Sequence, residues 1–382
     1  MGKVLIISCN DSYDYHTRTK YVKDYFQKRG YKVEFLTADF DHRSKARYRA
    51  KRKDTMHYIH VKSYKRNLSI SRILSHIQFA KGVRDYLKHN SYELIYHCAP
   101  PNYTIKELSH FKKKNSDVFL ITEIGDMWPE TLPIPKIAKR LCYIPLKRWE
   151  NLRNKNLNNS DILITECNLF QAMIESKAHA AAKTLYFCKP FAGRDNFICP
   201  DFGLEMKLCY LGSINNIVDI DVIARLVKVI SAGRRVTVDI IGDGEKRERL
   251  VSEIKKNGAE AVFHGMIFDE YRKRDVLEKC HFALNIMKPQ VCVGMTMKSL
   301  DYFSYGIPVI NNIGGDIKEL VSRERVGINL DISNSRTLDR ILHMTERDYL
   351  EMRGRMKDFH NQYFSVEGFD RSMDRLLKME EI

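Results

Sequence analysis

The residues with the clearest chemical potential are Thr296, Lys298 and Asp301, which follow a loop containing a glycine and precede Gly306. This spacing predicts a helix that begins at about Thr296 and ends before Gly306, followed by a buried strand. Free N–H groups at a helix start, beside a lysine, suit a diphosphate. Asp301, one turn later, is within reach of a sugar hydroxyl. The alternative is an ordinary helix–strand unit capped by Gly306, and spacing alone leaves both open.

Glycines also follow three other predicted strands in the second half of the chain. They are Gly212 with Ser213, Gly242 with Gly244, and Gly265 between His264 and Met266. Glycine lets a backbone approach a ligand closely, although it often ends a strand only to make the turn. No G-x-G-x-x-G or Walker A motif is present, so a dinucleotide or ATP P-loop site is not supported.

In the first half, polar residues follow two predicted strands. Asp14, His16 and Arg18 come after the first strand, and Glu123 ends a later one. That later strand leads into Gly125-Asp-Met-Trp-Pro-Glu130, in which Asp126 and Glu130 could bind sugar hydroxyls and Trp128 could stack on a sugar ring. The alternative is that Trp128 is a core residue and Asp126 caps the next turn.

The elements that must position these residues alternate between short β-branched runs and amphipathic helical stretches. This order predicts parallel sheets covered by helices on both faces, an α/β fold. The expected strands are Val4–Ser8, Lys32–Thr37, His57–Val61, Leu94–Ala99, Val118–Glu123, Asp161–Glu166, Thr184–Cys188, Lys207–Gly212, Arg235–Gly242, Ala261–Gly265, His281–Met287, Pro308–Asn311 and Gly327–Leu330. One long helix is expected at Lys136–Leu157, and the pattern lapses at Phe191–Glu205, where we expect an interdomain linker. In such sheets ligands bind beyond the carboxyl ends of the strands.

The composition is that of a soluble globular protein. No stretch approaches the ~20 apolar residues of a membrane span. The N-terminus reads as a strand rather than a signal peptide, so we expect a cytoplasmic protein. The nine cysteines are scattered singly, without C-x-x-C or H-E-x-x-H, which predicts core thiols and no metal site.

Positive charge is concentrated in the first half of the chain. Residues 1–200 hold 36 Lys and Arg against 19 Asp and Glu, whereas residues 201–382 hold 28 against 29. The excess peaks in Arg43–Arg66, where ten basic residues accompany one acidic residue, Asp54. One-sided charge indicates an anionic partner, which could be nucleic acid, an acidic membrane surface or a phosphorylated substrate. A solubilising surface is the alternative.

The order of the strand-end motifs, together with Met297-Lys-Ser-Leu-Asp-Tyr-Phe-Ser-Tyr-Gly-Ile-Pro-Val-Ile310, resembles the family 4 glycosyltransferases. Gly125–Glu130 is similar to a signature of a bacterial subset that builds capsule, O-antigen and related surface glycans. The resemblance covers essentially the whole chain. It implies the GT-B fold, with two Rossmann-like domains at residues 1–197 and 198–363, and a last helix at about 364–382 that packs back on the first domain.

The resemblance also implies a retaining transferase that uses a nucleotide diphosphate sugar, with UDP preferred, and neither a metal nor a cofactor. The expected catalytic residues are Asp126 and Lys298. The expected donor-binding residues are Gly212, Ser213, Gly242, Gly244, His264, Gly265, Met266, Gly294, Met295, Thr296, Met297 and Asp301, with His264–Met266 at the base and Asp301 at the ribose. The expected acceptor-binding residues are Asp14, His16, Arg18, Glu123, Trp128 and Glu130. The implied acceptor is a saccharide, often linked to polyprenyl diphosphate, at the inner face of the plasma membrane, where the basic first domain would bind peripherally.

Four positions depart from the family pattern. Val293 stands where the first Glu of the family's Glu-x7-Glu motif is expected, and Asp301 replaces the second. Ser213 and Val218 stand where an Arg and a Lys usually bind phosphate. Lys298 is therefore the nearby cation expected to neutralise the leaving diphosphate.

Two rival functions remain at the level of sequence. A nucleotide-sugar 2-epimerase of the same fold would need additional catalytic carboxylates and histidines, and no convincing set is present. A nucleic-acid-binding protein would interleave aromatic with basic residues, as Tyr48, Tyr58 and Tyr64 do among Arg43–Arg66, but no nucleic-acid motif appears and no nucleic acid partner is expected.

Overall fold

The computed structural model describes residues 2–10, 18–48, 55–132, 134–194, 197, 200, 203 and 205–378. The chain forms two compact units. Unit 1 comprises residues 1–186 with 370–382, and unit 2 comprises residues 187–369. The sequence analysis placed these boundaries after residue 197 and before residue 364.

Unit 1 is built on a seven-stranded parallel sheet with the order β3-β2-β1-β4-β5-β6-β7. Its strands are β1 (Lys3–Ser8), β2 (Lys32–Ala38), β3 (Met56–Ile59), β4 (Leu94–Ala99), β5 (Phe119–Ile124), β6 (Ile162–Thr165) and β7 (Lys183–Thr184). The central strands β1, β4 and β5 are buried along most of their length because helices cover both faces of the sheet.

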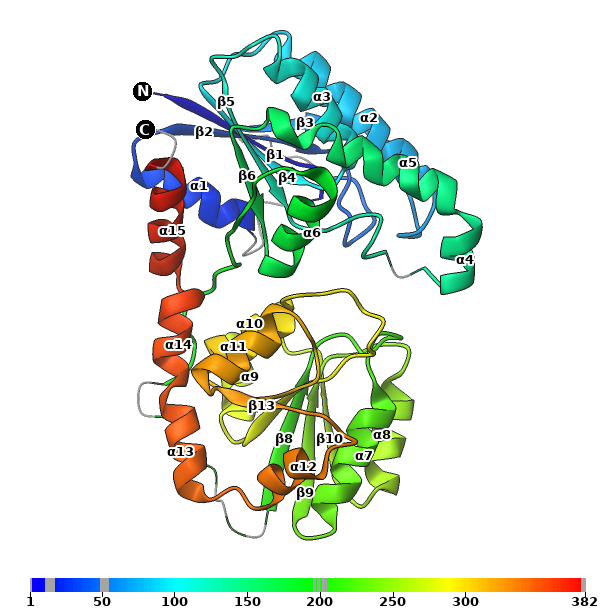
Figure 1. Cartoon of the computed structure of the whole chain (residues 1–382), viewed down its shortest axis with the longest axis vertical. Helices are drawn as coiled ribbons and strands as arrows, with labels where there is room; N and C mark the ends of the chain where they lie inside the picture. Colours follow the sequence, from blue (N-terminus) through cyan, green and yellow to red (C-terminus); the bar gives the residue numbers. More distant parts are fainter. Residues whose placement is uncertain are drawn as a thin grey trace. The chain divides into compact units, whose positions relative to one another are not determined.

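The helices of unit 1 lie on the two faces of this sheet. They are α1 (Arg18–Lys28), α2 (Ile70–Leu87), α3 (Asn102–Lys112), α4 (Lys136–Leu141), α5 (Tyr143–Asn154) and α6 (Asn168–Ala178), with the short 3-10 helix η1 (Leu157–Asn159). The helices α2, α3 and α5 form one layer, and α1 lies on the opposite face (Figure 1). The expected single helix over residues 136–157 is wrong. It breaks at Cys142, whose φ of −96° and ψ of 20° leave the helical region, and this break separates α4 from α5.

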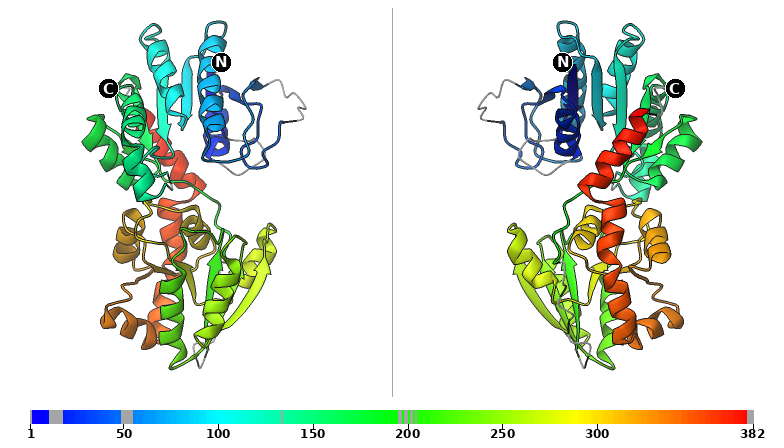
Figure 2. Two further views of the ribbon diagram at one scale, coloured as in Figure 1. Left: turned by 90° about the vertical axis from the view of Figure 1, so that its right-hand side faces the viewer. Right: turned by 90° about the vertical axis from the view of Figure 1, so that its left-hand side faces the viewer.

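Unit 2 is built on a six-stranded parallel sheet with the order β10-β9-β8-β11-β12-β13. Its strands are β8 (Glu205–Leu211), β9 (Arg235–Ile241), β10 (Glu260–Gly265), β11 (Phe282–Asn285), β12 (Val309–Asn311) and β13 (Gly327–Asn329). Its helices are α7 (Ile220–Ser231), α8 (Arg247–Lys256), α9 (Glu270–Leu277), α10 (Met297–Ser304), α11 (Asp316–Glu324), α12 (Ser335–Leu342), α13 (Glu346–Gly354) and α14 (Met356–Tyr363). Helices cover both faces of the sheet (Figures 1 and 2).

The last helix, α15 (Val366–Lys378), begins in unit 2 and continues in unit 1. Its unit 1 half packs beside α1 through charged groups. Asp374 accepts hydrogen bonds from Tyr25 at 2.8 Å and from Arg29, and Asp370 pairs with Lys28 at 2.8 Å. These contacts tie the C-terminal segment to the start of the chain.

The expected α/β fold with two doubly wound parallel sheets is therefore confirmed. All strands of each sheet run parallel, so their carboxyl ends meet along one edge of that sheet. The loops that leave this edge in each unit hold the residues considered next.

Candidate functional site

The strand-end loops of unit 2 pack against one another at glycines. A Cβ on Gly242 would lie 2.0 Å from the carbonyl oxygen of Gly212, and a Cβ on Gly244 would lie 2.3 Å from that of Ile214. Gly212, Gly242 and Gly244 also have φ values of 116°, 138° and 157°, which favour glycine. Gly242 and Gly244 thus allow two backbones to approach each other, a requirement of the fold itself. Their expected role toward a donor stays a prediction.

The loop after β11 leads into α10 through a capped helix start. The Thr296 hydroxyl is the N-cap and accepts a hydrogen bond from the Ser299 N–H at 3.0 Å. The backbone of Gly294 accepts from Ile317 N–H at 3.0 Å, which anchors the loop to α11. Met295 is buried, whereas Met297 is exposed. This is the helix start expected from the sequence.

Lys298 projects from the first turn of α10 toward the loop after β8. Its Nζ lies 4.1 Å from the ring centroid of Tyr210, and a Cβ on Gly212 would lie 3.6 Å from its Cε. The Tyr210 hydroxyl donates to the carbonyl of Ser213 at 2.8 Å, so one tyrosine fixes both the loop and the position of the lysine. Among the residues that the structure describes, the Lys298 Nζ is buried and has no hydrogen-bond partner.

This environment makes the Lys298 charge costly. Burial lowers the pKa of its ammonium group from 10.5 to about 7. A buried ammonium group without a hydrogen-bond partner is rare in a protein core, because contact with an aromatic ring offsets only part of its desolvation. The site is therefore chemically complementary to an anion, and the start of α10 beside it is suited to phosphate oxygens.

Asp301, one turn further along α10, already has a partner within unit 2. Its Oδ1 accepts a hydrogen bond from the Lys189 Nζ at 2.7 Å, and Lys189 also lies 3.6 Å from Glu270. Although burial opposes it, bonds from Lys273 and Tyr305 lower the pKa of Glu270 to about 2. Asp301 therefore belongs to a charged network around α9 and α10. A ribose hydroxyl that binds Asp301 would have to share its carboxylate with Lys189.

His264, expected near the base of a nucleotide, is held from within the sheet. Its Nε2 lies 2.6 Å from Asp239 Oδ1 on β9, which fixes the ring orientation. Gly265, with φ of 69°, makes the turn that follows, and no described atom lies within 4 Å of a Cβ built there. Met266 is 65% exposed at the same sheet edge. These residues lie at the strand end where the sequence analysis placed them.

In unit 1, the expected catalytic residue Asp126 closes its own loop. Its Oδ2 accepts a hydrogen bond from the Trp128 indole N–H at 2.6 Å, and its Oδ1 accepts one from the Thr131 hydroxyl. Burial raises the pKa of this carboxyl group, although these hydrogen bonds oppose the change. The geometry is the turn-capping arrangement that the sequence left open as an alternative.

Trp128 is a core residue, with 8% of its surface exposed. The His76 ring stacks on it at a centroid distance of 5.6 Å, the Arg72 guanidinium lies 4.4 Å from its centroid, and Trp149 packs at 6.0 Å. The expected stacking of this indole on a sugar ring does not fit this conformation, because other side chains already cover the ring.

Arg18 and Glu123 form a buried ion pair. The Arg18 Nε donates to Glu123 Oε1 at 2.6 Å, and the Tyr96 hydroxyl donates to Oε2 at 2.6 Å. Arg18 also donates to the carbonyls of Leu185 and Tyr186. Both residues, expected at the acceptor, are therefore engaged inside unit 1. Asp14 and His16 lie outside the described residues.

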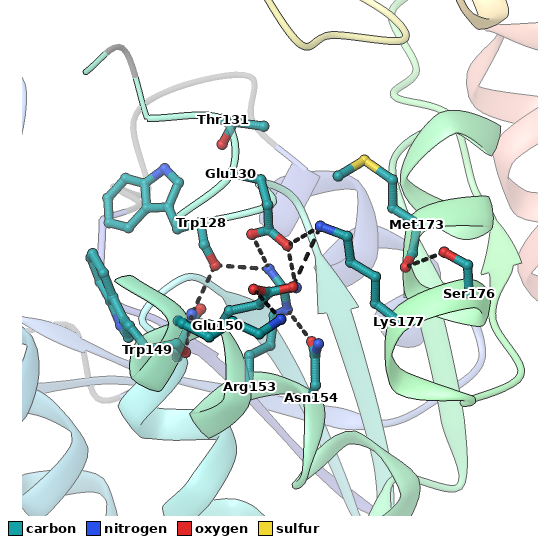
Figure 3. Close-up of polar contacts among 12 residues, drawn as sticks. Trp128, Glu130, Thr131, Trp149, Glu150, Arg153, Asn154, Met173, Ser176 and Lys177 are labelled. Carbon is teal, nitrogen blue, oxygen red and sulfur yellow. Dashed lines mark hydrogen bonds and ion pairs between the residues drawn. The ribbon is translucent and has the colours of Figure 1, made fainter. Parts of the chain in front are cut away.

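Glu130 anchors the loop after β5 to the neighbouring helices. Arg153 of α5 donates to its two carboxylate oxygens at 2.9 and 2.8 Å, and Lys177 of α6 lies 3.2 Å away. Lys177 also reaches Glu150 at 3.4 Å, so the loop, α5 and α6 share one charged cluster (Figure 3). Burial would raise the pKa of Glu130, but Arg153 outweighs it and lowers the pKa.

Most of unit 2 matches a known protein family. Residues 205–344 match the family model for glycosyl transferases group 1. Unit 2 therefore contains a glycosyl transferases group 1 domain. The matched range contains every expected donor-binding residue, the Tyr210–Lys298 contact included. No curated protein matches the chain in sequence.

Solved structures of glycosyltransferases share the fold over nearly the whole chain. Sucrose-phosphate synthase from Thermosynechococcus elongatus has a TM-score of 0.73 at 13% identity and covers 99% of both chains. HepE of Anabaena, in complex with UDP and glucose, has a TM-score of 0.63 at 13% identity and covers 99% of this chain and 100% of its own. The lipopolysaccharide outer core galactosyltransferase WaaB has a TM-score of 0.66 at 12% identity and covers 99% of both chains. The chain therefore has the GT-B fold.

Sequence reasoning missed the residues that set the environment of the site. Tyr210 lies in a strand where an aromatic residue signals only a core position, and Lys189 meets Asp301 from 112 positions away along the chain. Arg72 and His76 lie on α2, with no local motif to connect them to Trp128. Among the described residues, no group of three or more His, Cys, Asp or Glu residues is arranged to hold a metal ion.

Proposed function

We propose that this protein is a glycosyltransferase that moves a sugar from a UDP-sugar to a saccharide acceptor with retention of anomeric configuration, as family 4 enzymes do. One observation carries the proposal. The buried Nζ of Lys298, in the first turn of α10, has no hydrogen-bond partner among the described residues, and the side chain lies beside Gly212. An anionic diphosphate is the ligand that this arrangement would stabilise. The UDP in the HepE structure supports uridine as the nucleoside.

In the proposed reaction, the bond between the anomeric carbon and the diphosphate oxygen breaks on the face from which the acceptor hydroxyl approaches. A bond then forms from that hydroxyl oxygen to the anomeric carbon, and its proton passes to the departing phosphate oxygen. Lys298 stabilises the charge that develops on the diphosphate. The reaction requires positioning and charge stabilisation rather than a protein nucleophile, and no metal is proposed.

The proposed acceptor is linked to a lipid, as in the assembly of bacterial surface glycans. The support is the charge distribution, since residues 1–200 carry 36 basic against 19 acidic residues. A basic surface favours a substrate held at an anionic membrane, at about 1 kcal/mol for each nearby Lys or Arg. The proposed location is therefore the cytoplasmic side of the membrane, with peripheral attachment through unit 1.

The test is a screen of nucleotide sugars for turnover by the wild type, Lys298→Ala and a control. Lys228→Ala removes an exposed lysine from α7 of the same unit and serves as the matched control. We expect Lys298→Ala to lower kcat/KM by about 100-fold or more, the usual effect of losing a charge-stabilising group. Lys228→Ala should match the wild type. Equal turnover by all three proteins would remove Lys298 from the mechanism.

A thermal-shift experiment separates this function from its rivals. Stabilisation by UDP, and not by GDP or an oligonucleotide, supports a uridine-dependent transferase. Stabilisation by the oligonucleotide alone would favour the nucleic-acid-binding alternative. Conversion of a nucleotide sugar to its 2-epimer without an acceptor would identify an epimerase.

A further inference from the structure

Four large apolar side chains protrude from unit 1 where α4 meets α5. Ile137, Leu141, Tyr143 and Ile144 are 77, 81, 63 and 65% exposed. Single exposed apolar residues are common on protein surfaces, whereas these four lie within eight positions of the chain. We call these four residues the apolar ridge.

Basic residues surround the apolar ridge in sequence. Residues 131–149 contain five Lys and Arg and no Asp or Glu. They are Lys136, Lys139, Arg140, Lys147 and Arg148. Lys139 donates to the carbonyl of Glu130 at 2.9 Å and Lys147 pairs with Glu150 at 2.9 Å, while Arg140 and Arg148 remain on the exposed surface.

A basic pocket continues this surface along α5. It has a volume of about 430 Å³ and lies between α3 and α5, lined by Lys106, His110, Arg148, Asn151, Leu152, Lys155 and Asn156. Its lining contains three permanent cations and no carboxylate. Ile144 and Arg148 of α5 and its C-cap residue Lys155 recur at spacings of four and seven residues, so they share one face that leads from the ridge to the pocket.

The opposite face of α5 is fixed within unit 1. Glu150 and Arg153 belong to the charged cluster with Glu130 and Lys177, and Arg153 is fully buried (Figure 3). The helix cannot turn Tyr143 and Ile144 inward without breaking these bonds. These two ridge residues are thus held at the surface by α5, and Ile137 and Leu141 protrude beside them from α4.

We propose that the apolar ridge and the basic pocket dock on a bilayer containing anionic phospholipid, with the ridge in the interface and the pocket at phosphate headgroups. This inference rests on the proposed membrane-side function and names the surface that performs it. A basic, apolar-tipped helical segment has the composition of an interfacial element. Protein interfaces are depleted in lysine, so the lysines at the ridge favour lipid over a protein partner. Among the described residues, no helix is long and apolar enough to cross the membrane.

The test measures co-sedimentation of the full chain with vesicles of pure phosphatidylcholine and of phosphatidylcholine mixed with phosphatidylglycerol. Wild type should bind the anionic vesicles on the order of tenfold more tightly, and salt should weaken this binding. Leu141→Glu with Ile144→Glu should lower binding to the anionic vesicles by about tenfold or more. Arg148→Glu with Lys155→Glu should remove the preference for them.

Phe268→Glu in unit 2 is the matched control, because Phe268 is 81% exposed, as is Leu141. It should bind vesicles as the wild type does. Failure of the wild type to bind anionic vesicles, or equal loss in Phe268→Glu, would overturn the proposal. Sedimentation velocity without vesicles provides a further check. A wild-type dimer that the ridge variants abolish would also overturn the proposal, because the ridge would then join two copies of the chain.

Vesicle binding and donor chemistry are measured separately, so the two proposals can fail independently. The ridge variants should keep the thermal shift with UDP, which shows that unit 2 is folded. A wild type that binds vesicles but turns over no nucleotide sugar would contradict the transferase proposal and would still support the docking surface.

Discussion

Lys298 lies in surroundings that disfavour a positive charge. Burial lowers the pKa of its ammonium group from 10.5 to about 7, so the unliganded side chain loses its proton near neutral pH. Between these two values the unfolded chain binds more protons than the folded chain. The free energy of unfolding of the ligand-free protein should therefore rise with pH across this window. Urea denaturation over this pH range should show the rise in the wild type and not in Lys298→Met.

The same residue should couple UDP binding to proton uptake. A diphosphate favours the charged ammonium group, so binding above pH 7 requires a proton and should weaken as the pH increases. Lys298→Arg keeps its charge throughout, because a guanidinium does not titrate in this range. Calorimetry in buffers of different ionisation enthalpy should detect proton uptake in the wild type and less in Lys298→Arg. Equal uptake in both proteins would assign the proton to UDP or another residue.

Asp126 is the residue for which a catalytic and a structural role predict different measurements. Its carboxylate accepts hydrogen bonds from Trp128 and Thr131, and a hydrogen bond to a charged group contributes about 1.5–3 kcal/mol. Asp126→Ala should therefore lower the free energy of unfolding by about 2 kcal/mol and change the emission of the two tryptophans. Thr131→Val should reproduce part of the loss. A variant with unchanged stability and emission but greatly reduced kcat would restore the catalytic assignment.

At the scale of elements, the packing of the loops after β8 and β9 depends on one glycine. A Cβ on Gly242 would lie 2.0 Å from the Gly212 carbonyl oxygen, and its φ of 138° also disfavours other residues. Gly242→Ala should cost more than about 3 kcal/mol, since backbone must move and φ is strained. Gly233→Ala is the control, because no atom lies within 4 Å of its Cβ position and it should be neutral or slightly stabilising. Thermal denaturation of both variants measures the difference, and equal melting temperatures would contradict it.

Elements that depend on local sequence could be predicted from periodicity and spacing. The strand Leu94–Ala99 and the helix start at Thr296 could be predicted because each depends on local sequence, an apolar run in one case and a cap in the other. The break at Cys142 also has a local signal that the sequence analysis missed, because Pro145 has no N–H to donate to residue 141 and is tolerated only in the first turn of a helix.

For the candidate site, too, residues with a local sequence signal could be predicted, and their long-range partners could not. Lys298 was found because it lies within a helix-start motif, whereas its aromatic support, Tyr210, comes from another strand. Arg18 and Glu123 were expected to bind the acceptor, and in the structure they pair with each other across 105 positions. Partners that lie far apart in the chain are brought together by the fold, and a single sequence does not reveal them.

At the scale of the whole molecule, the two units differ in chemistry. Unit 1 contains the surplus of basic residues, and its described strand-end carboxylates Glu123 and Glu130 are paired internally. Unit 2 carries Lys298, whose buried Nζ has no hydrogen-bond partner among the described residues. We therefore propose donor recognition for unit 2, and a role on the acceptor side for the basic surface of unit 1.

This assignment predicts how UDP alters hydrogen exchange in the intact chain. Protection should be strongest at residues 211–214 and 294–300, the two segments that adjoin the Lys298 side chain, because a bound diphosphate would hold them together and slow their local opening. Uridine lacks the diphosphate and should protect these segments far less. Lys298→Ala should reduce the protection given by UDP toward the level given by uridine. Protection that is as strong at the strand ends of β1, β4 and β5 as in unit 2, with either ligand, would contradict the division of roles.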